Sequence, residues 1–216
     1  MQQLNVIGTY NIRDLGSYPT LGGQRTRKQW LIRSGNLDKL PIASQQQLYD
    51  YGVRTIIDIR DEWEVEHYPN VFSDSMDVTY HNLPLLGDAL SNDEDWQRES
   101  KQYVHLHDLY NKYLEKCKTQ IASIISTIAT SDAITICHCH AGKDRTGIIV
   151  ALILSVVGVA HNHIAHDYAL SRQEINHLVD EWRQYAIAHD KALDELERGA
   201  ASDPETILTM LHYIQE

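Results

Sequence analysis

Cysteine is scarce in this sequence: Cys117, Cys137 and Cys139 are the only three among 216 residues. So few thiols, in an odd number, do not make a disulfide framework and are more typical of a protein kept in a reducing compartment. Met1 is followed by a polar segment that lacks the basic and apolar stretches of a secretory signal. We therefore expect a cytoplasmic protein with free thiols, and export by a route that needs no signal peptide is left open.

Basic residues are also few, with 19 Lys and Arg against 30 Asp and Glu and a formal net charge of −11. This balance argues against a general nucleic-acid binder or a membrane-surface protein, because such proteins bind through clustered cations. The longest apolar stretch, 148–160, is shorter than the roughly 18 residues of a membrane-spanning helix. We therefore expect no nucleic-acid partner and no transmembrane segment, and an anionic ligand would have to be held locally.

Repeats, low-complexity tracts and linker-like stretches are missing as well. The composition, 43% hydrophobic and 23% charged, is that of a globular protein, and residues 1–216 are expected to form a single domain. Apolar strand candidates alternate with helical stretches, which predicts an α/β fold with a central, mostly parallel sheet flanked by helices. The expected strands are 29–33, 53–59, 78–83 and 134–138.

Two serines are expected at the beginnings of helices. Ser44 precedes a short helical stretch, and Gly52 is expected to end that stretch. Ser202, with Glu205 three residues later and Pro204 in the first turn, matches a capping-box pattern near the end of the chain.

The most informative segment is HCHAGKDRTG, residues 138–147, which lies between a predicted strand and a predicted helix. A turn of this length can aim its backbone N–H groups inward, Arg145 adds a planar fork that matches two oxygens, and the helix adds the positive end of its dipole. The segment therefore predicts a pocket for a phosphate-like anion above the sulfur of Cys139. The expected cradle consists of His140, Ala141, Gly142, Lys143, Asp144, Arg145 and Thr146.

This pocket predicts a particular chemistry. Its positive surroundings should favour the thiolate of Cys139, which attacks phosphorus without the help of a base. Arg145 and Lys143 would neutralise the transferring group, while loop N–H groups meet its oxygens as charge develops. The expected intermediate is a phosphocysteine, and the Thr146 hydroxyl could point back at the sulfur to make it a better leaving group. His140 is expected at the rim of the pocket, and no metal or other cofactor is required.

A leaving phenolate or alkoxide needs a proton, so a carboxylic acid is expected over the loop. Asp144 lies inside the loop beside Lys143, whereas Asp88 follows the predicted strand 78–83 and Pro84. We favour Asp144 as the general acid and keep Asp88 as the second candidate.

Several polar residues near the loop have both structural and functional interpretations. His138 is expected to order the loop from below. Asp58 with Arg60, and Arg13 with Asp14, are expected to form salt bridges under the loop, and contact with the substrate is the alternative.

The run 137–140 also contains the residue types of a metal site. Alternating strand residues face opposite sides, however, and a zinc site needs four convergent ligands, so we expect no metal here. Cys137 is expected to fill the core, and a disulfide with Cys139 is the minor alternative.

The loop resembles the signature of the protein tyrosine phosphatase superfamily, and three further motifs narrow the resemblance. They are NIRDLG from Asn11, LIRSG with Arg33 and Ser34, and DIRDEWE from Asp58 to Glu64. Together with GKDRTG they resemble a bacterial family of tyrosine and phosphoinositide phosphatases. The resemblance implies a cysteine-phosphatase fold and a metal-free reaction on phosphotyrosine, and sometimes on phosphoserine, phosphothreonine or phosphoinositides.

The sequence therefore predicts a cysteine-dependent phosphomonoester hydrolase that releases inorganic phosphate from a phosphorylated protein or a phosphoinositide. A phospho-ligand-binding protein without catalysis is one alternative. A sulfurtransferase or an arsenate reductase is another, because both can hold an anion in a cysteine loop of related design. Turnover assays and the mass of the Cys139 adduct distinguish these possibilities.

Overall fold

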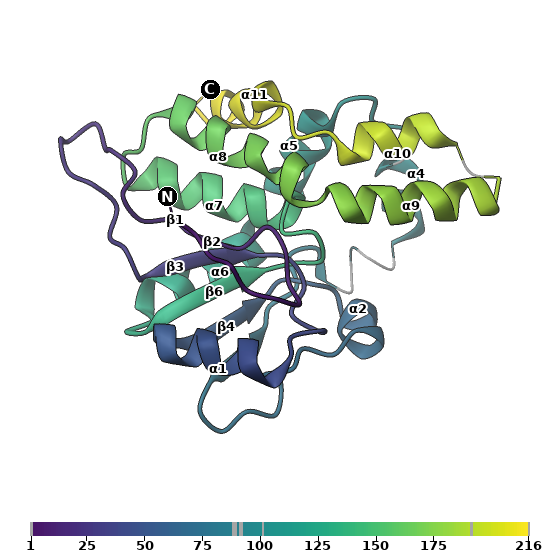
Figure 1. Cartoon of the computed structure of the whole chain (residues 1–216). Helices are drawn as coiled ribbons and strands as arrows, with labels where there is room; N and C mark the ends of the chain where they lie inside the picture. Colours follow the sequence, from purple (N-terminus) through teal and green to yellow (C-terminus); the bar gives the residue numbers. More distant parts are fainter. Residues whose placement is uncertain (1, 88–89, 91–92, 101, 191, 216) are drawn as a thin grey trace.

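A six-stranded sheet forms the centre of the computed structural model, which describes residues 2–87, 90, 93–100, 102–190 and 192–215 (Figure 1). The strands are β1 (Gln2–Gln3), β2 (Arg13–Asp14), β3 (Leu31–Ser34), β4 (Val53–Asp58), β5 (Thr79–Asn82) and β6 (Ile134–His138). Their order is β1-β2-β3-β6-β4-β5, with parallel pairing from β3 to β5 and antiparallel pairing only at the β1-β2-β3 edge. The predicted α/β fold with a mostly parallel sheet is confirmed.

The predicted strand 134–138 agrees with β6 residue for residue, and the other expected strands differ from the observed ones by one or two residues at their ends. β3 begins only at Leu31, because Gln29 has a positive φ of 54° that an extended strand cannot include. β1 and β2 were not expected, since a strand of two residues is too short to show a periodicity.

Helices cover both faces of the sheet. The helices given for the described residues are α1 (Ile42–Tyr51), α2 (Glu62–His67), α4 (Glu94–Ser100), α5 (Leu106–Lys116), α6 (Lys118–Thr130), α7 (Asp144–Val156), α8 (His161–Glu174), α9 (Asn176–Ala188), α10 (Leu193–Ala200) and α11 (Pro204–Tyr213). One face of the sheet packs on α1 through a cluster that includes Ile32, Ile56 and Ile136, while the other packs on α6, α7 and α8 through a cluster that includes Ile57 and Cys137. Figure 1 shows α9 and α10 side by side as a pair that extends beyond the sheet.

The helix ends correct two predictions. α1 begins one turn earlier than expected, because Pro41 occupies the N-cap position and Ser44 lies inside the helix. α11 has Asp203 at its N-cap, and the buried hydroxyl of Ser202 makes no hydrogen bond to a described residue, so the predicted capping box is wrong. Gly52 does end α1, with a left-handed φ of 105°.

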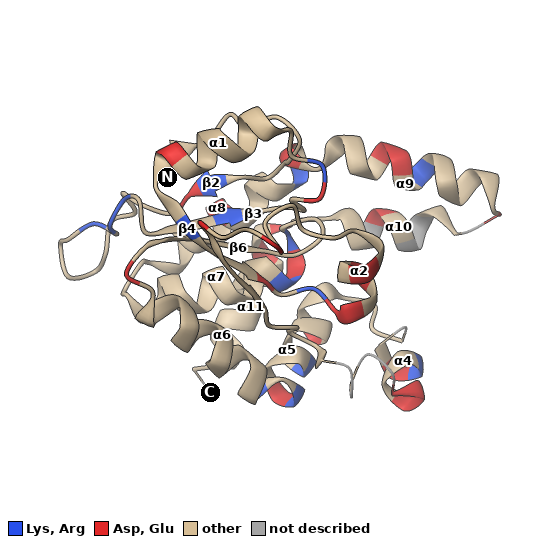
Figure 2. Ribbon diagram, turned by 90° about the horizontal axis from the view of Figure 1, so that it is seen from below, with Lys and Arg blue, Asp and Glu red and all other residues tan. Residues whose placement is uncertain are grey.

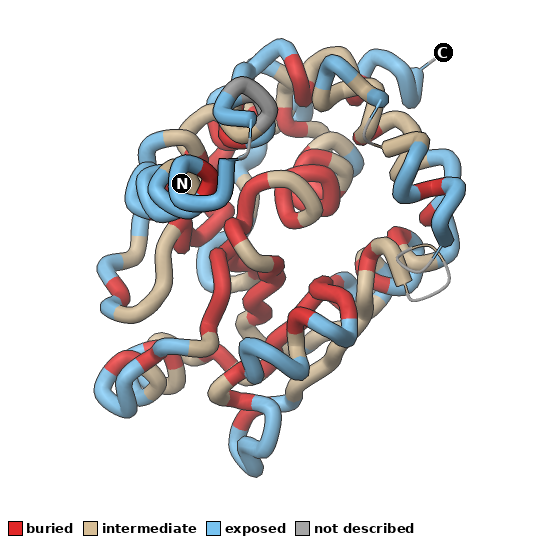
Figure 3. The backbone as a smooth tube through the Cα atoms, turned by 90° about the vertical axis from the view of Figure 1, so that its right-hand side faces the viewer, coloured by how far each residue is buried: buried red, intermediate tan, exposed pale blue. Residues whose placement is uncertain are grey.

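The register of the strands explains where the loop after β6 lies. Buried residues lie toward the inside of the molecule and exposed residues toward its outside (Figure 3). The carboxyl ends of β3, β6 and β4 lie side by side, because Ser34 and Asp58 are each paired with His138 in the register of the sheet. Polar side chains at these ends therefore converge on the loop that follows β6.

No helix in the described part of the chain is both long enough and apolar enough to cross a membrane.

Candidate active site

Cys139 follows the last residue of β6, and the loop from it leads directly into α7 at Asp144. Only 3% of the Cys139 residue is exposed, and it lies in a cavity of about 360 Å³. The residues that line the cavity are Trp63, Glu64, Tyr68, Cys139, His140, Ala141, Asp144, Arg145 and Trp182. The structure thus brings the predicted cysteine, arginine and loop aspartate to one cavity at the N-terminus of a helix of 13 residues.

Donors outside the loop hold its backbone in a single orientation. The N–H of Asn36 donates to the His140 carbonyl at 2.8 Å. Asn11 Nδ2 donates to the carbonyls of Ala141 and Gly142 at 3.1 and 2.9 Å. Arg33 Nη2 also donates to the Gly142 carbonyl, at 2.5 Å. In a trans peptide the N–H points opposite to the C=O of the same plane. The N–H groups of residues 141–143 are therefore turned away from these donors, as binding of an anion on the other side of the loop requires.

Gly142 is the residue that lets the loop turn this tightly. It has a positive φ of 64°, and a Cβ atom there would overlap the backbone carbonyl of Ser34. Glycine at this position therefore satisfies both the conformation and the close approach of β3.

Arg145 is held by Glu64, a residue that the sequence showed only as part of a motif. Its Nη1 and Nη2 atoms donate to Glu64 Oε2 and Oε1 at 2.5 and 2.8 Å, in a bidentate pair. Burial by itself would lower the pKa of Arg145, but these hydrogen bonds and the charge of Cys139 raise it, so the guanidinium stays charged. Glu64 uses one N–H of each terminal nitrogen, and Asp61 Oδ2 lies 3.7 Å from Nη1. The second N–H of Nη2 and the N–H of Nε can therefore meet an oxyanion.

A buried ion-pair cluster lies beneath the loop. Arg13 Nε and Arg33 Nη1 donate to the two carboxylate oxygens of Asp167 at 2.8 and 2.6 Å, and Tyr18 adds its hydroxyl at 2.8 Å. Burial opposes ionisation of Asp167, yet the two arginines hold its pKa well below its usual range. The structure thus places Arg13 in a salt bridge under the loop and not at the cavity. Sequence reasoning missed Asp167 altogether.

Asp14 belongs to a different network, away from the loop. Its carboxylate accepts hydrogen bonds from the backbone N–H groups of Gly16 and Gln29, both at 2.7 Å, and from the Tyr51 hydroxyl at 2.9 Å. These contacts tie the segment between β2 and β3 to α1, so the structure gives Asp14 a structural position.

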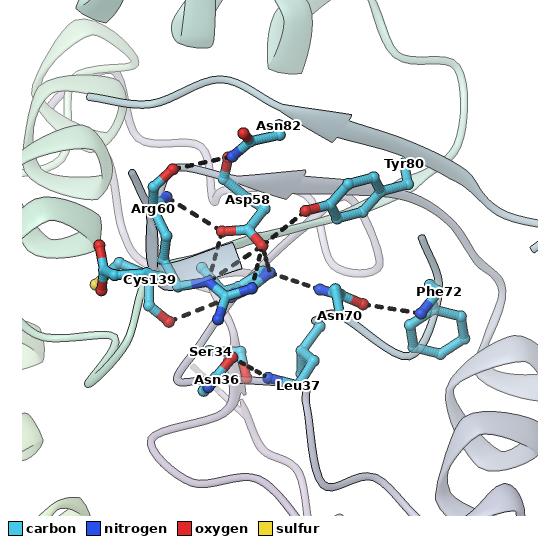
Figure 4. A network of polar contacts seen from close by, with 12 residues as sticks. Ser34, Asn36, Leu37, Asp58, Arg60, Asn70, Phe72, Tyr80, Asn82 and Cys139 are labelled. Carbon is cyan, nitrogen blue, oxygen red and sulfur yellow. Dashed lines mark hydrogen bonds and ion pairs between the residues drawn. The ribbon is translucent and has the colours of Figure 1, made fainter. Parts of the chain in front are cut away.

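Asp58 and Arg60 form a second buried ion pair, with both side chains 0% exposed (Figure 4). Arg60 donates to Asp58 Oδ2 at 2.5 Å, and the Tyr80 hydroxyl donates to the same oxygen at 2.9 Å. Although burial would raise the pKa of Asp58, the hydrogen bonds and the charge of Arg60 lower it. Of the two interpretations, the structure fits the salt bridge and not a substrate contact.

His138 lies beside this ion pair, and its hydrogen bonds identify its tautomer. Asn70 accepts the N–H of Phe72 through Oδ1 at 2.9 Å, so its Nδ2 group faces His138 Nε2, also at 2.9 Å. Nε2 is therefore an acceptor, and Nδ1 carries the proton toward the Cys139 carbonyl at 3.2 Å. Burial lowers the pKa of His138 despite the nearby Asp58, which agrees with a neutral ring. The imidazole thus supports the start of the loop from beneath.

Lys143 occupies a place that the sequence did not predict. Its ammonium group donates to the Gly199 carbonyl and, at 2.7 Å, to the Ala201 carbonyl, both at the C-terminal end of α10. It is 1% exposed and is not among the residues that line the cavity. In this structure Lys143 joins the loop to α10 and does not face the anion pocket.

The remaining predicted residues have distinct positions. Asp144 lines the cavity, is 36% exposed at its side chain, and accepts a hydrogen bond from the Tyr110 hydroxyl. The buried hydroxyl of Thr146 makes no hydrogen bond to any described residue, so the contact expected with the Cys139 sulfur is not formed here. Asp88 lies outside the described residues.

Aromatic residues surround the mouth of the cavity. His140 is at the rim, as expected, with its ring centroid 5.9 Å from that of Tyr68 and 6.5 Å from that of Trp182. Burial and Arg145 keep the pKa of His140 below its ordinary value, against the effect of Glu64. Trp63 on α2 lines the cavity as well. A planar group bound through an anion at Cys139 would therefore lie between aromatic side chains.

Cys137 is buried and free, and burial raises its pKa. This position agrees with its expected role as a core residue. Within the described ranges, His, Cys, Asp and Glu side chains do not gather in any group of three or more that could hold a metal ion.

Comparison with known proteins identifies the family. Residues 4–216 match the model of a tyrosine phosphatase family. A tyrosine-protein phosphatase of Nostoc commune is 31% identical over 142 residues, which are 65% of this chain and 47% of that protein. The triple specificity protein phosphatase PtpB of Mycobacterium tuberculosis is 26% identical over 196 residues, 79% of this chain and 70% of the relative.

Two further comparisons concern another relative and a solved structure. A protein of Cupriavidus necator is 28% identical over 168 residues, 76% of this chain and 60% of its own length. The chain thus spans between about half and about seven-tenths of the length of these relatives. The crystal structure of P. aeruginosa TpbA aligns with 78% of this chain and 76% of its own at a TM-score of 0.44 and 14% identity, which is too distant to assign any residue a role. On the evidence of the family model, the chain belongs to the tyrosine phosphatase family.

Proposed function

We propose that this protein hydrolyses phosphomonoesters, above all phosphotyrosine in proteins, through a phosphocysteine intermediate. The observation that carries the proposal is the position of Cys139 in a cavity at the N-terminus of α7, beside a guanidinium held in a bidentate pair by Glu64. A thiolate in this place has an anion pocket above it and a cation beside it. This is what in-line transfer of a phosphoryl group to sulfur requires.

In the proposed first step, the Cys139 sulfur attacks phosphorus and the bond to the leaving oxygen breaks. The loop N–H groups and Arg145 bind the equatorial oxygens as charge develops on them. Asp144 gives a proton to the leaving oxygen. In the second step water attacks the phosphocysteine, Asp144 takes up the proton of that water, and inorganic phosphate leaves the thiolate of Cys139.

The walls of the cavity favour phosphotyrosine over a phosphoinositide. Trp63, Tyr68 and Trp182 offer aromatic surface to a phenyl ring, which an inositol ring cannot use in the same way. Carboxylates next to these walls, including Glu62, Glu66 and Glu181, are exposed, and Figure 2 shows acidic residues on α2 and α9. An anionic membrane surface would be repelled by them, because recognition of such lipids relies on clustered Lys and Arg.

The test is phosphate release from three substrates: a phosphotyrosine peptide, a phosphoserine peptide of the same sequence, and phosphatidylinositol phosphates in vesicles. Wild type and Cys139→Ser are compared in buffer that contains a chelator. We expect turnover of the phosphotyrosine peptide that is lost in the variant. Binding of the peptide without turnover by the wild type would instead support a phospho-ligand-binding protein, and faster turnover of the vesicles would overturn the substrate class.

The sulfurtransferase and arsenate reductase alternatives predict different products on the cysteine. Sulfur transfer would leave a persulfide on Cys139, and arsenate reduction would need a resolving thiol. Cys137, the nearest candidate, is fully buried, which argues against that role. The mass of the Cys139 adduct after turnover distinguishes a phosphoryl group from a persulfide.

We further propose that the protein works in a reducing compartment, such as the cytoplasm. The proposal is supported by the three free cysteines, because the thiolate that the reaction needs would be inactivated by oxidation.

A further inference from the structure

Two buried tyrosines lie beside Asp144 and are not among the residues that line the Cys139 cavity. Tyr110 on α5 is 0% exposed and Tyr168 on α8 is 1% exposed. The Tyr110 hydroxyl donates to Asp144 Oδ1, and the two tyrosine hydroxyls are 2.7 Å apart. Three helices thus converge on one carboxyl group, since Asp144 is the first residue of α7.

The direction of these hydrogen bonds follows from the number of protons. A phenol has one proton, and Tyr110 uses its proton for Asp144. The bond between the tyrosines must then be donated by Tyr168 to the Tyr110 oxygen. Burial and the charge of Asp144 raise the pKa of Tyr110 well above its ordinary value, so its hydroxyl keeps its proton at neutral pH.

The two oxygens of Asp144 are therefore not equivalent. Oδ1 receives the Tyr110 hydroxyl and has the Lys143 ammonium at 3.1 Å, whereas the structure gives Oδ2 no hydrogen bond to a described residue. A proton on the carboxyl group belongs on the oxygen that is not already surrounded by donors. That oxygen is Oδ2, on a side chain that lines the cavity.

We propose that Tyr110, supported by Tyr168, is a positioning residue that fixes the Asp144 carboxyl so that Oδ2 presents its proton to the leaving oxygen. The inference rests on the proposed phosphatase function. During transfer, the Cys139 sulfur bonds to phosphorus, the bond from phosphorus to the leaving oxygen breaks with its electron pair on that oxygen, and the proton passes from Oδ2 to it. Oδ1 keeps its hydrogen bond from Tyr110 throughout, so the resulting carboxylate needs no reorganisation.

The test uses leaving groups that differ in their need for a proton. A phosphotyrosine peptide releases a phenol with a pKa near 10 and needs the acid, whereas 4-nitrophenyl phosphate releases a stabilised phenolate that does not. We measure kcat/KM for both substrates with the same preparation of wild type and Tyr110→Phe. The ratio of the two values does not depend on how much of the preparation is folded. We expect kcat/KM for the peptide to fall about tenfold and that for 4-nitrophenyl phosphate by less than about twofold, since general acids typically contribute more than a hundredfold in full.

Three further variants make the result specific. Asp144→Asn should change the ratio more than Tyr110→Phe, and adding Tyr110→Phe to it should have no further effect. Tyr168→Phe should change the ratio less, because it leaves the bond between Tyr110 and Asp144 in place. Tyr113→Phe is the matched control: it removes a hydroxyl from the same helix that makes no hydrogen bond to Asp144, and its ratio should equal that of wild type.

Each failure has its own meaning. An unchanged ratio in Tyr110→Phe beside a changed ratio in Asp144→Asn would show that Tyr110 only supports the fold, and would overturn the inference. An unchanged ratio in Asp144→Asn would overturn it too, while leaving a Cys139-dependent phosphatase in place. Turnover that survives in Cys139→Ser would refute the proposed function itself.

Discussion

The pair of Glu64 and Arg145 offers a quantitative test of how the anion pocket is built. Glu64→Gln keeps the shape of the side chain and one acceptor oxygen but turns an amide toward the second guanidinium nitrogen. One of the two charge-assisted hydrogen bonds, of 2.5 and 2.8 Å, is therefore lost. A bond of this kind is worth about 2 kcal/mol. Both side chains are largely buried, at 7% and 16% exposure, so little of this is screened by solvent.

If the whole effect is felt in the transition state, a loss of about 2 kcal/mol corresponds to a fall of about 30-fold in kcat/KM. We expect that fall, together with weaker competitive inhibition by inorganic phosphate, because the fork of Arg145 is no longer fixed. The assay is kcat/KM for a phosphotyrosine peptide, with Glu66→Gln, an exposed residue of the same helix, as the control. A Glu64→Gln protein that is less stable but retains the wild-type kcat/KM and phosphate affinity would refute the reasoning.

Three other predictions concern the loop and its supports. Gly142→Ala should lower the free energy of unfolding by about 1–3 kcal/mol and abolish phosphate binding, because the φ of 64° and the nearby Ser34 carbonyl exclude a Cβ atom. Calorimetric titration with phosphate measures this binding, and unchanged binding would contradict the prediction. Lys143→Met should lower the midpoint of urea unfolding, because it removes the hydrogen bonds to the carbonyls at the end of α10. The KM for a phosphopeptide should change less than about twofold. A raised KM at unchanged stability would instead mean that Lys143 binds phosphate. Burial lowers the pKa of His138 in the folded state, so a proton binds more readily to this histidine in the unfolded chain. The free energy of unfolding should therefore fall as the pH drops below about 6.5, by no more than about 1.4 kcal/mol per pH unit for this group. Urea unfolding of wild type and His138→Asn across this range should show a shallower slope for the variant, and equal slopes would contradict the assignment.

The sequence was most informative where the structure is determined locally. β6 was predicted to the residue, and the loop was predicted to lie between it and a helix, because an apolar strand, a glycine-containing turn and an apolar segment follow one another directly. The convergence of Cys139, Asp144 and Arg145 on one cavity follows from the same short segment. The two-residue strands β1 and β2 carry no such signal, since each is too short to show a periodicity.

The supports of the loop depend on long-range partners and were harder to predict. Asp167 is bound by Arg13 and Arg33, which lie 154 and 134 residues away in the sequence. The motif around Arg33 indicated a role without identifying its partner. The available signal for Asp167 was a single acidic residue in the helical segment HIAHDYAL, which contains no Lys or Arg. A carboxylate that falls on a buried helical face needs a cation.

Lys143 shows a different limit. Its position in the loop suggested a phosphate ligand, but a side chain of this length can reach either side of the loop. The structure directs it to the carbonyl groups at the end of α10, a helix that the sequence did not predict. The choice between the two positions depends on the α9–α10 pair, whose packing against Ala141 arises only in the folded chain.

The claim that Cys139 is the nucleophile is tested most directly by trapping the intermediate. The wild-type protein is mixed with a phosphotyrosine peptide in chelator-containing buffer, quenched in acid within the first turnover, digested and analysed by mass spectrometry. We expect the mass of one phosphoryl group on the peptide that contains Cys139, and no such adduct in Cys139→Ser. Turnover at full rate with no phosphoryl group on Cys139, or with the group on another residue, would contradict the account.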